Sequence, residues 1–91
     1  MGTAFGGLAG STESHENQTK LQFREVVRLS RTFEYLKKKP KNARSRMVAL
    51  DLYGAAVLAS AENTYSNSLT DDERSMLFSV KQDTRRYLGA G

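Results

Sequence analysis

Apolar residues recur at helical spacing along residues 16–38, which predicts an amphipathic helix for this segment. One side of that helix is formed by Phe23, Val26, Val27, Ser30, Phe33 and Leu36. At 100° per residue, a row of cationic residues falls nearly opposite this side. Pro40 predicts that the helix ends before it, because the residue preceding a proline avoids the α region.

A second helix is predicted over residues 42–62. Asn42 is a favoured N-cap residue, and residues 63–68 have the composition of a loop. Apolar side chains point almost all round this helix, at Met47, Val48, Leu50, Leu52, Tyr53, Val57 and Leu58. A helix that is apolar on most sides normally packs against more than one neighbour, so we expect it to be the central helix.

A third helix is predicted over residues 70–88 from the residues at its two ends. Thr70 and Glu73 match a capping box, and Gly89 is typical of the residue that follows a helix. Acidic residues in the first turn and arginines in the last suit the helix dipole. Because no segment alternates like a strand, the sequence predicts an all-α, three-helix domain.

The rest of the domain organisation follows from length and composition. Residues 1–15 contain four of the seven glycines, so we expect a flexible, Gly/Ser-rich tail, with residues 16–91 as a single helical domain. A domain of this size buries only about 60% of its unfolded surface. The chain has no cysteine, so disulfides cannot compensate. Packing between two copies can compensate for the limited burial, and we therefore expect a homodimer.

The fourteen Lys and Arg residues are unevenly distributed. Residues 20–46 contain ten of them and two acidic residues, which gives this segment a net charge of +8. The rest of the chain contains four basic and eight acidic residues, which gives a net charge of −4. The ten are Lys20, Arg24, Arg28, Arg31, Lys37, Lys38, Lys39, Lys41, Arg44 and Arg46. A charge distribution polarised in this way attracts polyanions.

Some of these cations are placed where they destabilise the free protein. The like-charge pairs Lys20–Arg24 and Arg24–Arg28 cost roughly 0.2–0.5 kcal/mol each. Arg44 and Arg46 oppose the dipole at the start of the second helix by about 0.3–1 kcal/mol each. The lysines at residues 37–39 suit the end of the first helix, so a solvated surface explains them without a ligand. We predict that the ten cations contact phosphates.

The sequence favours recognition of a nucleic-acid duplex, RNA or DNA, through its backbone and shape. The second helix is too apolar for a helix-turn-helix recognition helix, and few exposed aromatics are available to stack on single strands. The third helix offers further cations on the side of Phe78. The alternative is a protein-interaction module whose cationic surface binds an acidic partner protein. Binding to an anionic membrane surface is disfavoured, because the first helix has a modest apolar side and no Trp.

Catalysis is not expected. His15 is the only histidine, and Thr19 stands where a zinc-protease motif beginning at His15 needs a second one. Without cysteine there is no thiolate metal site, and no Gly-rich loop joins a strand to a helix. We expect no enzyme activity, no catalytic residue, no metal and no cofactor.

The apolar segments are too short or too interrupted to act as membrane or export signals. Residues 47–61 fall short of the roughly twenty residues that a bilayer-spanning helix needs. The weakly apolar residues 4–9 follow no Lys or Arg, unlike those of a secretory signal. We expect an intracellular, cytoplasmic protein. RNA versus DNA preference, sequence specificity, biological process, oligomeric state and the identity of any protein partner are left open by the sequence.

Overall fold

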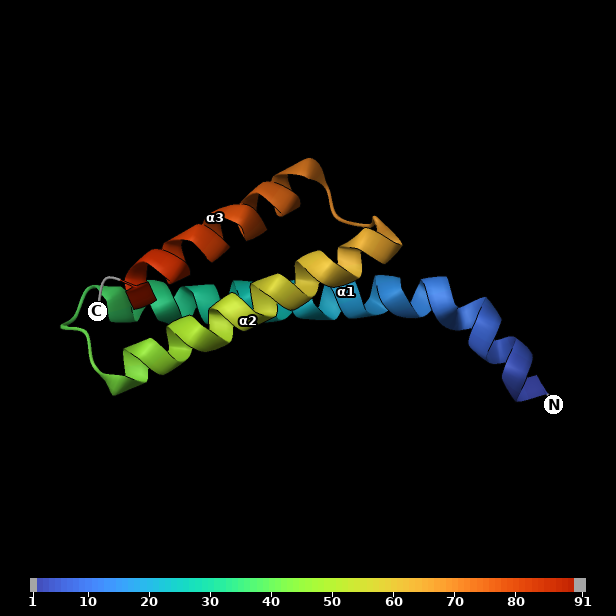
Figure 1. The fold of residues 1–91 in the computed structure, drawn as a ribbon, viewed down its shortest axis with the longest axis horizontal. Coiled ribbons are helices and arrows are strands. Elements are labelled where there is room, and N and C mark those ends of the chain that lie inside the picture. The colour runs from blue at the N-terminus through green and yellow to red at the C-terminus, as the bar shows by residue number, and fades with distance from the viewer. Residues whose placement is uncertain (1, 90–91) are drawn as a thin grey trace.

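The computed structural model describes the backbone of residues 2–89 and the side chains of residues 14–89. This part of the chain forms three helices and no strand: α1 (Gly2–Lys37), α2 (Ala43–Ser66) and α3 (Asp71–Gly89). Each helix reverses the direction of the one before it, and α2 packs against both α1 and α3 (Figure 1). The predictions of an all-α fold and of a central second helix are confirmed.

The helix α1 is longer than the sequence analysis predicted. It begins at Gly2 instead of near residue 16 and ends at Lys37 instead of residue 38. The flexibility of residues 1–15 and the single domain over residues 16–91 stay predictions.

The start of α2 confirms Asn42 as its N-cap. The Asn42 side chain accepts a hydrogen bond from the main-chain N–H of Ser45 at 2.8 Å, and the Ser45 hydroxyl accepts one from the N–H of Asn42 at 3.0 Å. These reciprocal bonds form a capping box with serine in place of the usual acidic residue. The Ser45 hydroxyl also accepts a hydrogen bond from the Tyr87 hydroxyl at 2.8 Å, so it connects this cap to α3.

The end of α2 lies beyond its predicted end at residue 62, because the helix continues to Ser66 through most of the predicted loop. The buried Asn63 side chain accepts hydrogen bonds from the main-chain N–H groups of Ser68 and Leu69, at 2.9 and 3.0 Å. Asn67 then adopts the left-handed conformation, with a φ of 47°, and its N–H donates to the Asn63 carbonyl at 2.7 Å. Asparagine tolerates this conformation, and the αL residue ends the helix.

The helix α3 runs from Asp71 to Gly89, so it begins and ends one residue later than the predicted range of 70–88. The N–H of Thr70 donates to the Glu73 carboxylate at 2.8 Å and the N–H of Glu73 donates to the Thr70 hydroxyl at 3.1 Å, which confirms the capping box. Gly89 is the last helical residue, and no glycine among the described residues has a positive φ. Gly89 is therefore not the left-handed residue expected after the helix.

The core lies where α2 crosses its two neighbours. Small buried residues on α2 bring the helices close together, at Ala49, Ala55, Ala56 and Ala59. Val26 and Phe33 of α1 and Leu77 of α3 belong to the same buried cluster as Leu52 of α2. Near its C-terminal end α3 also meets α1, where the rings of Phe33 and Tyr87 contact edge to face at 5.0 Å. Toward its N-terminal end α3 diverges from α1 (Figure 1).

One side of α2 remains exposed, because two neighbouring helices cannot cover a helix that is apolar nearly all round. Its large exposed apolar residues are Met47, Leu50, Val57, Leu58 and Tyr65. Met47 is 64% exposed and Leu50 is 59% exposed, values typical of surface positions. These two residues do not belong to the core of a single chain.

Candidate functional site

The cations of α1 that recur at helical spacing are all exposed. They are Lys20, Arg24, Arg28 and Arg31, with Lys38 directly after the helix, and we call these five residues the α1 stripe. The buried side of α1 is formed by Thr19, Val26, Leu29, Phe33 and Leu36. At 100° per residue, the centres of the two sets lie on opposite sides of the helix. The stripe therefore points away from the core.

Within the stripe, only Arg28 makes an ion pair with a residue of the described segment. Its guanidinium contacts the Glu25 carboxylate twice, at 2.5 and 3.2 Å. The hydrogen bond to Glu25 and the charge of that carboxylate raise the pKa of Arg28 above its usual value. Arg28 is therefore charged at every physiological pH. An exposed pair of this kind contributes little to stability, so a phosphate could replace the carboxylate.

The other four stripe residues have no carboxylate partner among the side chains of residues 14–89. Lys20, Arg24, Arg31 and Lys38 form no ion pair in that part of the chain. The stripe thus keeps most of its charge free for a ligand in solution.

The lysines at the junction of α1 and α2 have different environments. Lys37 pairs with Glu34 at 2.9 Å, and its ammonium lies 5.2 Å from the centre of the Phe33 ring. Lys39 is exposed, with its ammonium 5.0 Å from the centre of the Tyr35 ring. Both contacts leave the charge accessible at the surface.

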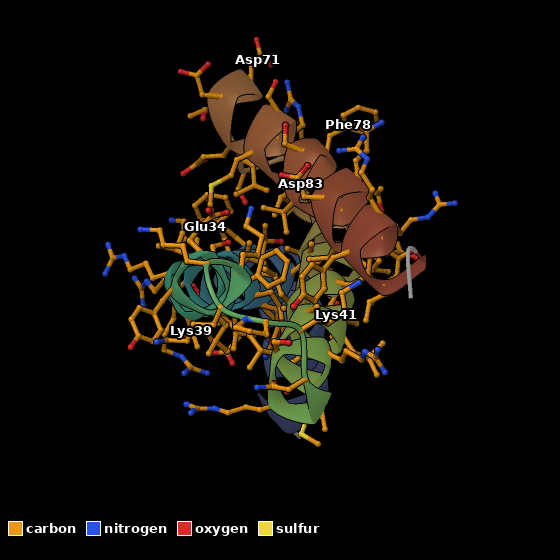
Figure 2. All side chains as sticks on the ribbon, turned by 90° about the vertical axis from the view of Figure 1, so that its left-hand side faces the viewer. Glu34, Lys39, Lys41, Asp71, Phe78 and Asp83 are labelled. Atoms are coloured by element: carbon orange, nitrogen blue, oxygen red, sulfur yellow. The ribbon has the colours of Figure 1, made fainter. Side chains whose placement is uncertain are left out.

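Lys41 is half-buried and is bonded to α3. Its ammonium donates a hydrogen bond to the main-chain carbonyl of Tyr87 at 2.7 Å and lies 4.4 Å from the centre of that ring. In Figure 2, Lys39 lies beside the end of α1, whereas Lys41 lies toward α3. The sequence analysis did not anticipate this contact, because its two residues are separated by 46 positions.

Arg44 and Arg46 lie at the start of α2 and are exposed. The first turn of α2 contains no acidic residue that would offset them. At this end of the helix, the side chains of Asn42 and Ser45 each already accept a hydrogen bond from the main-chain N–H group of the other residue. An anion here would therefore be bound mainly by the two guanidinium groups and by the N–H groups that remain.

The cations of α3 lie apart from the α1 stripe. Arg74 pairs with Asp71 and donates to the Leu69 carbonyl at 3.1 Å. Lys81 and Arg85 border a groove of about 300 Å³ lined also by Tyr53, Val57, Phe78 and Gln82. Phe78 is 60% exposed and points away from α1 (Figure 2). This groove faces a different direction from the α1 stripe.

His15 also has a partner that sequence reasoning did not find. Its Nδ1 contacts the Glu62 carboxylate at 2.8 Å, and its ring stacks on Tyr65 with a centroid separation of 4.9 Å. These contacts fasten α1 to the last turns of α2. Among the described residues, no group of three His, Cys, Asp or Glu side chains is arranged to hold a metal ion.

No family model, no curated protein and no solved structure matches the chain. In the described part of the chain, no helix combines the length and the apolar character needed to cross a membrane.

Proposed function

We propose that the protein binds the sugar-phosphate backbone of a nucleic-acid duplex through the α1 stripe. The observation that supports this most directly is that Lys20, Arg24, Arg31 and Lys38 are exposed, without a carboxylate partner in the described region. Like charges along one helix side repel one another, so the free protein gains nothing from this arrangement. A row of phosphates would neutralise them.

The dimensions of the stripe suit a duplex. From Lys20 to Lys38 it spans about 27 Å at 1.5 Å per residue. Double-stranded DNA carries about one phosphate per 1.7 Å of its axis, so about 16 phosphates surround the duplex over this length, and those on one side can be contacted by the five cations. Contacts to the backbone position a protein without reading bases. The proposed binding is therefore independent of sequence, and it applies to RNA and DNA duplexes alike.

Residues near the α1–α2 junction would extend the interface. Lys39, Arg44 and Arg46 are exposed and would add contacts beyond the end of the stripe. Lys41 is bonded to Tyr87, so we assign this lysine to the fold. Lys37 pairs with Glu34 as Arg28 pairs with Glu25, and it stays exposed, so we keep it in the interface. The proposed interface then consists of the α1 stripe with Lys37, Lys39, Arg44 and Arg46.

A fluorescence-anisotropy titration with a labelled RNA duplex and a DNA duplex of the same sequence tests this proposal. With about six phosphate contacts on B-DNA, the logarithm of the binding constant should fall with the logarithm of salt concentration at a slope of about −5. Absence of binding to either duplex at low salt would contradict the proposed function.

Charge reversal tests the location of the interface. The double variant Arg24→Glu/Arg31→Glu should abolish most duplex binding. Arg85→Glu/Arg86→Glu makes the same change in net charge on exposed residues of α3 and serves as the matched control. Equal losses in both variants would show that net charge, and not the stripe, determines affinity.

The alternative function is binding of an acidic partner protein, and the exposed apolar side of α2 favours it. Such a partner could contact the α1 stripe and also cover Leu50 and Leu58, which single chains leave exposed. A stoichiometric protein partner that remains bound after nuclease treatment would support this alternative. Loss of the partner on nuclease treatment would support the duplex instead.

We also propose that the protein is a homodimer. Contiguous exposed apolar surface in a small soluble protein marks an interaction site, and five large apolar residues of α2 form such a surface. A second copy covering it would add the burial that a domain of this size lacks. Sedimentation equilibrium of the complete chain tests this directly.

A further inference from the structure

The exposed side of α2 has the spacing of a helix-pairing surface. Its residues are Met47, Leu50, Gly54, Val57, Leu58, Ala61 and Tyr65, and we call this set the α2 face. Positions 47, 50, 54, 57 and 61 alternate in steps of three and four, which is the a/d repeat of paired helices. The set runs along nearly the whole length of α2. It is the longest stretch of exposed apolar side chains on a helix in the described residues.

We propose that two copies of the chain pack through the α2 face as an antiparallel pair centred near Gly54. This inference rests on the homodimer proposed above and specifies its geometry. In this arrangement a two-fold axis runs perpendicular to both α2 helices. A residue that precedes Gly54 by a given number of positions then lies opposite the residue of the second copy that follows Gly54 by the same number. The contact is isologous, so it closes and does not propagate into filaments.

Charge complementarity favours the antiparallel direction. Arg44 lies in the first turn of α2 and Glu62 in its last turns, 18 residues later. The Glu62 Oε1 atom contacts His15 of the same chain, so Oε2 is the oxygen left for an arginine of the second copy. Eighteen residues are five turns, so both side chains lie on the same flank of the helix. A perpendicular two-fold axis brings each flank beside the same flank of the second copy. Arg44 then lies beside Glu62 of the second copy, and the midpoint of these positions, residue 53, adjoins Gly54.

A parallel pair lacks these advantages. It would place Arg44 and Arg46 beside the same two arginines of the second copy, at the same end of the paired helices. It would also align the two α2 dipoles in the same direction, which is unfavourable. The distribution of charge along α2 therefore distinguishes the two directions.

Side-chain sizes agree with the same axis. Met47 lies opposite Ala61 of the second copy, Leu50 lies opposite Leu58, and Gly54 lies opposite itself. Small residues thus lie at the centre of the contact and opposite Met47, whereas Leu50 and Leu58 pack against each other.

Gly54 has no evident role within a single chain. A Cβ atom built on Gly54 would meet nothing within 4 Å, so neither α1 nor α3 requires a glycine there. Glycine inside a helix is destabilising relative to alanine. A close approach of the second α2 at the centre of the dimer would require the small residue.

Cysteine cross-linking tests this geometry. The chain contains no cysteine, so only the introduced thiols can form disulfides. Met47→Cys and Ala61→Cys proteins are prepared separately, mixed, equilibrated and oxidised. We expect a disulfide-linked dimer in the mixture, whereas each variant alone should stay monomeric on a denaturing gel. In an antiparallel pair, two copies of position 47 are separated by 14 residues along the axis, about 21 Å. Disulfides need Cα atoms 4.4–6.8 Å apart.

The controls separate geometry from chance collision and from misfolding. Ser75→Cys mixed with Ser79→Cys places exposed thiols on α3, outside the α2 face, and should give no cross-link. Circular dichroism confirms that each variant is helical. Cross-linking of Met47→Cys with itself would indicate a parallel pair and overturn the proposal. A monomer by sedimentation would overturn it as well, whether the face is covered by residues 2–13 or by a different protein.

A charge exchange provides the second measurement. Arg44→Glu should weaken the dimer at least tenfold, and Arg44→Glu/Glu62→Arg should restore most of that loss. Arg46→Glu changes the charge equally on the opposite flank and should leave the dimer within about twofold of wild type. Because Glu62→Arg also removes the contact between Glu62 and His15, Glu62→Gln serves as the control for that loss within one chain. A double variant that is as helical as wild type but forms no tighter dimer than Arg44→Glu would overturn the proposed pairing. The duplex titration is read separately: loss of duplex binding with intact cross-linking contradicts the nucleic-acid function alone.

Discussion

The ammonium of Lys41 and the main-chain carbonyl of Tyr87 are joined by a hydrogen bond of 2.7 Å, although the two residues are 46 positions apart. The same ammonium lies over the Tyr87 ring. The linker between α1 and α2 is thereby fastened to the last turn of α3. A cation at that end also interacts favourably with the carbonyl groups that end a helix. One cation of the basic segment thus stabilises the fold, whereas its neighbours are exposed to solvent.

Replacing Lys41 should affect stability more than the replacement of a neighbouring lysine. Lys41→Ala removes a charge-assisted hydrogen bond and a cation–π contact, and should lower the free energy of unfolding by about 1.5–3 kcal/mol. Lys38→Ala removes an exposed side chain and should change it by less than about 0.5 kcal/mol. Urea unfolding followed by circular dichroism measures both. Equal effects would contradict the structural role of Lys41.

Two serines with buried hydroxyl groups should respond in opposite ways to alanine. The Ser45 hydroxyl bonds to Asn42 and Tyr87, so Ser45→Ala should destabilise the protein by about 1–3 kcal/mol. Among the side chains and backbone that the structure describes, the Ser30 hydroxyl finds no hydrogen-bond partner. Ser30→Ala should therefore be neutral, or stabilising by about 1 kcal/mol, because the buried polar group is removed. Thermal unfolding should show this as a difference of several degrees between the variants. A loss of stability in Ser30→Ala would show that its hydroxyl is bonded in solution.

Neutralising the arginines of the α1 stripe should reduce the salt dependence of duplex binding in steps. Each phosphate contact contributes about 0.9 to the slope on B-DNA. Arg24→Ala and Arg31→Ala should each lower the magnitude of the slope by that amount, and together by about 1.8. Anisotropy titrations at four or more salt concentrations measure these slopes, with Arg85→Ala as the control. A slope that does not change in the double variant would place the interface elsewhere.

Replacing Gly54 by alanine should separate helix stability from dimer affinity. The space around Gly54 is open in a single chain, and alanine favours the helix by about 1 kcal/mol. At concentrations where the protein is monomeric, Gly54→Ala should therefore raise the unfolding temperature. The added methyl group should also separate the two α2 helices and weaken the dimer in sedimentation experiments. Gly89→Ala, at the end of α3, should leave dimer affinity unchanged, and a tighter dimer in Gly54→Ala would contradict the proposed contact.

Features encoded by neighbouring residues could be predicted from the sequence. The caps at Asn42 and Thr70 depend on groups three positions away, and both are present. The separation of the α1 stripe from the buried side of α1 also follows from helical periodicity alone. The end of α2 was missed because Asn63, which reads as a loop residue, satisfies the turn after the helix with its buried side chain.

Contacts between distant residues could not be predicted. Nothing near Lys41 in the sequence indicates Tyr87, and nothing near His15 indicates Glu62. The pattern of α2 correctly indicated a central helix, but apolar periodicity does not state how many neighbours a single chain supplies. In a three-helix chain α2 has two neighbouring helices, α1 and α3, so Met47 and Leu50 remain outside the core.

The first turn of α2 has a consequence for how binding can be detected. Within a single chain, Arg44 and Arg46 lie at the positive end of a helix dipole, with no acidic residue in that turn to offset them, and this lowers the stability of the unliganded protein. A polyanion bound there removes this repulsion, and it stabilises the fold to the extent that it binds the native state more tightly than the unfolded chain. Heat resistance therefore becomes a reporter of occupancy: a duplex at 100 times its dissociation constant contributes about 2.7 kcal/mol when the unfolded chain does not bind it, and less when it does.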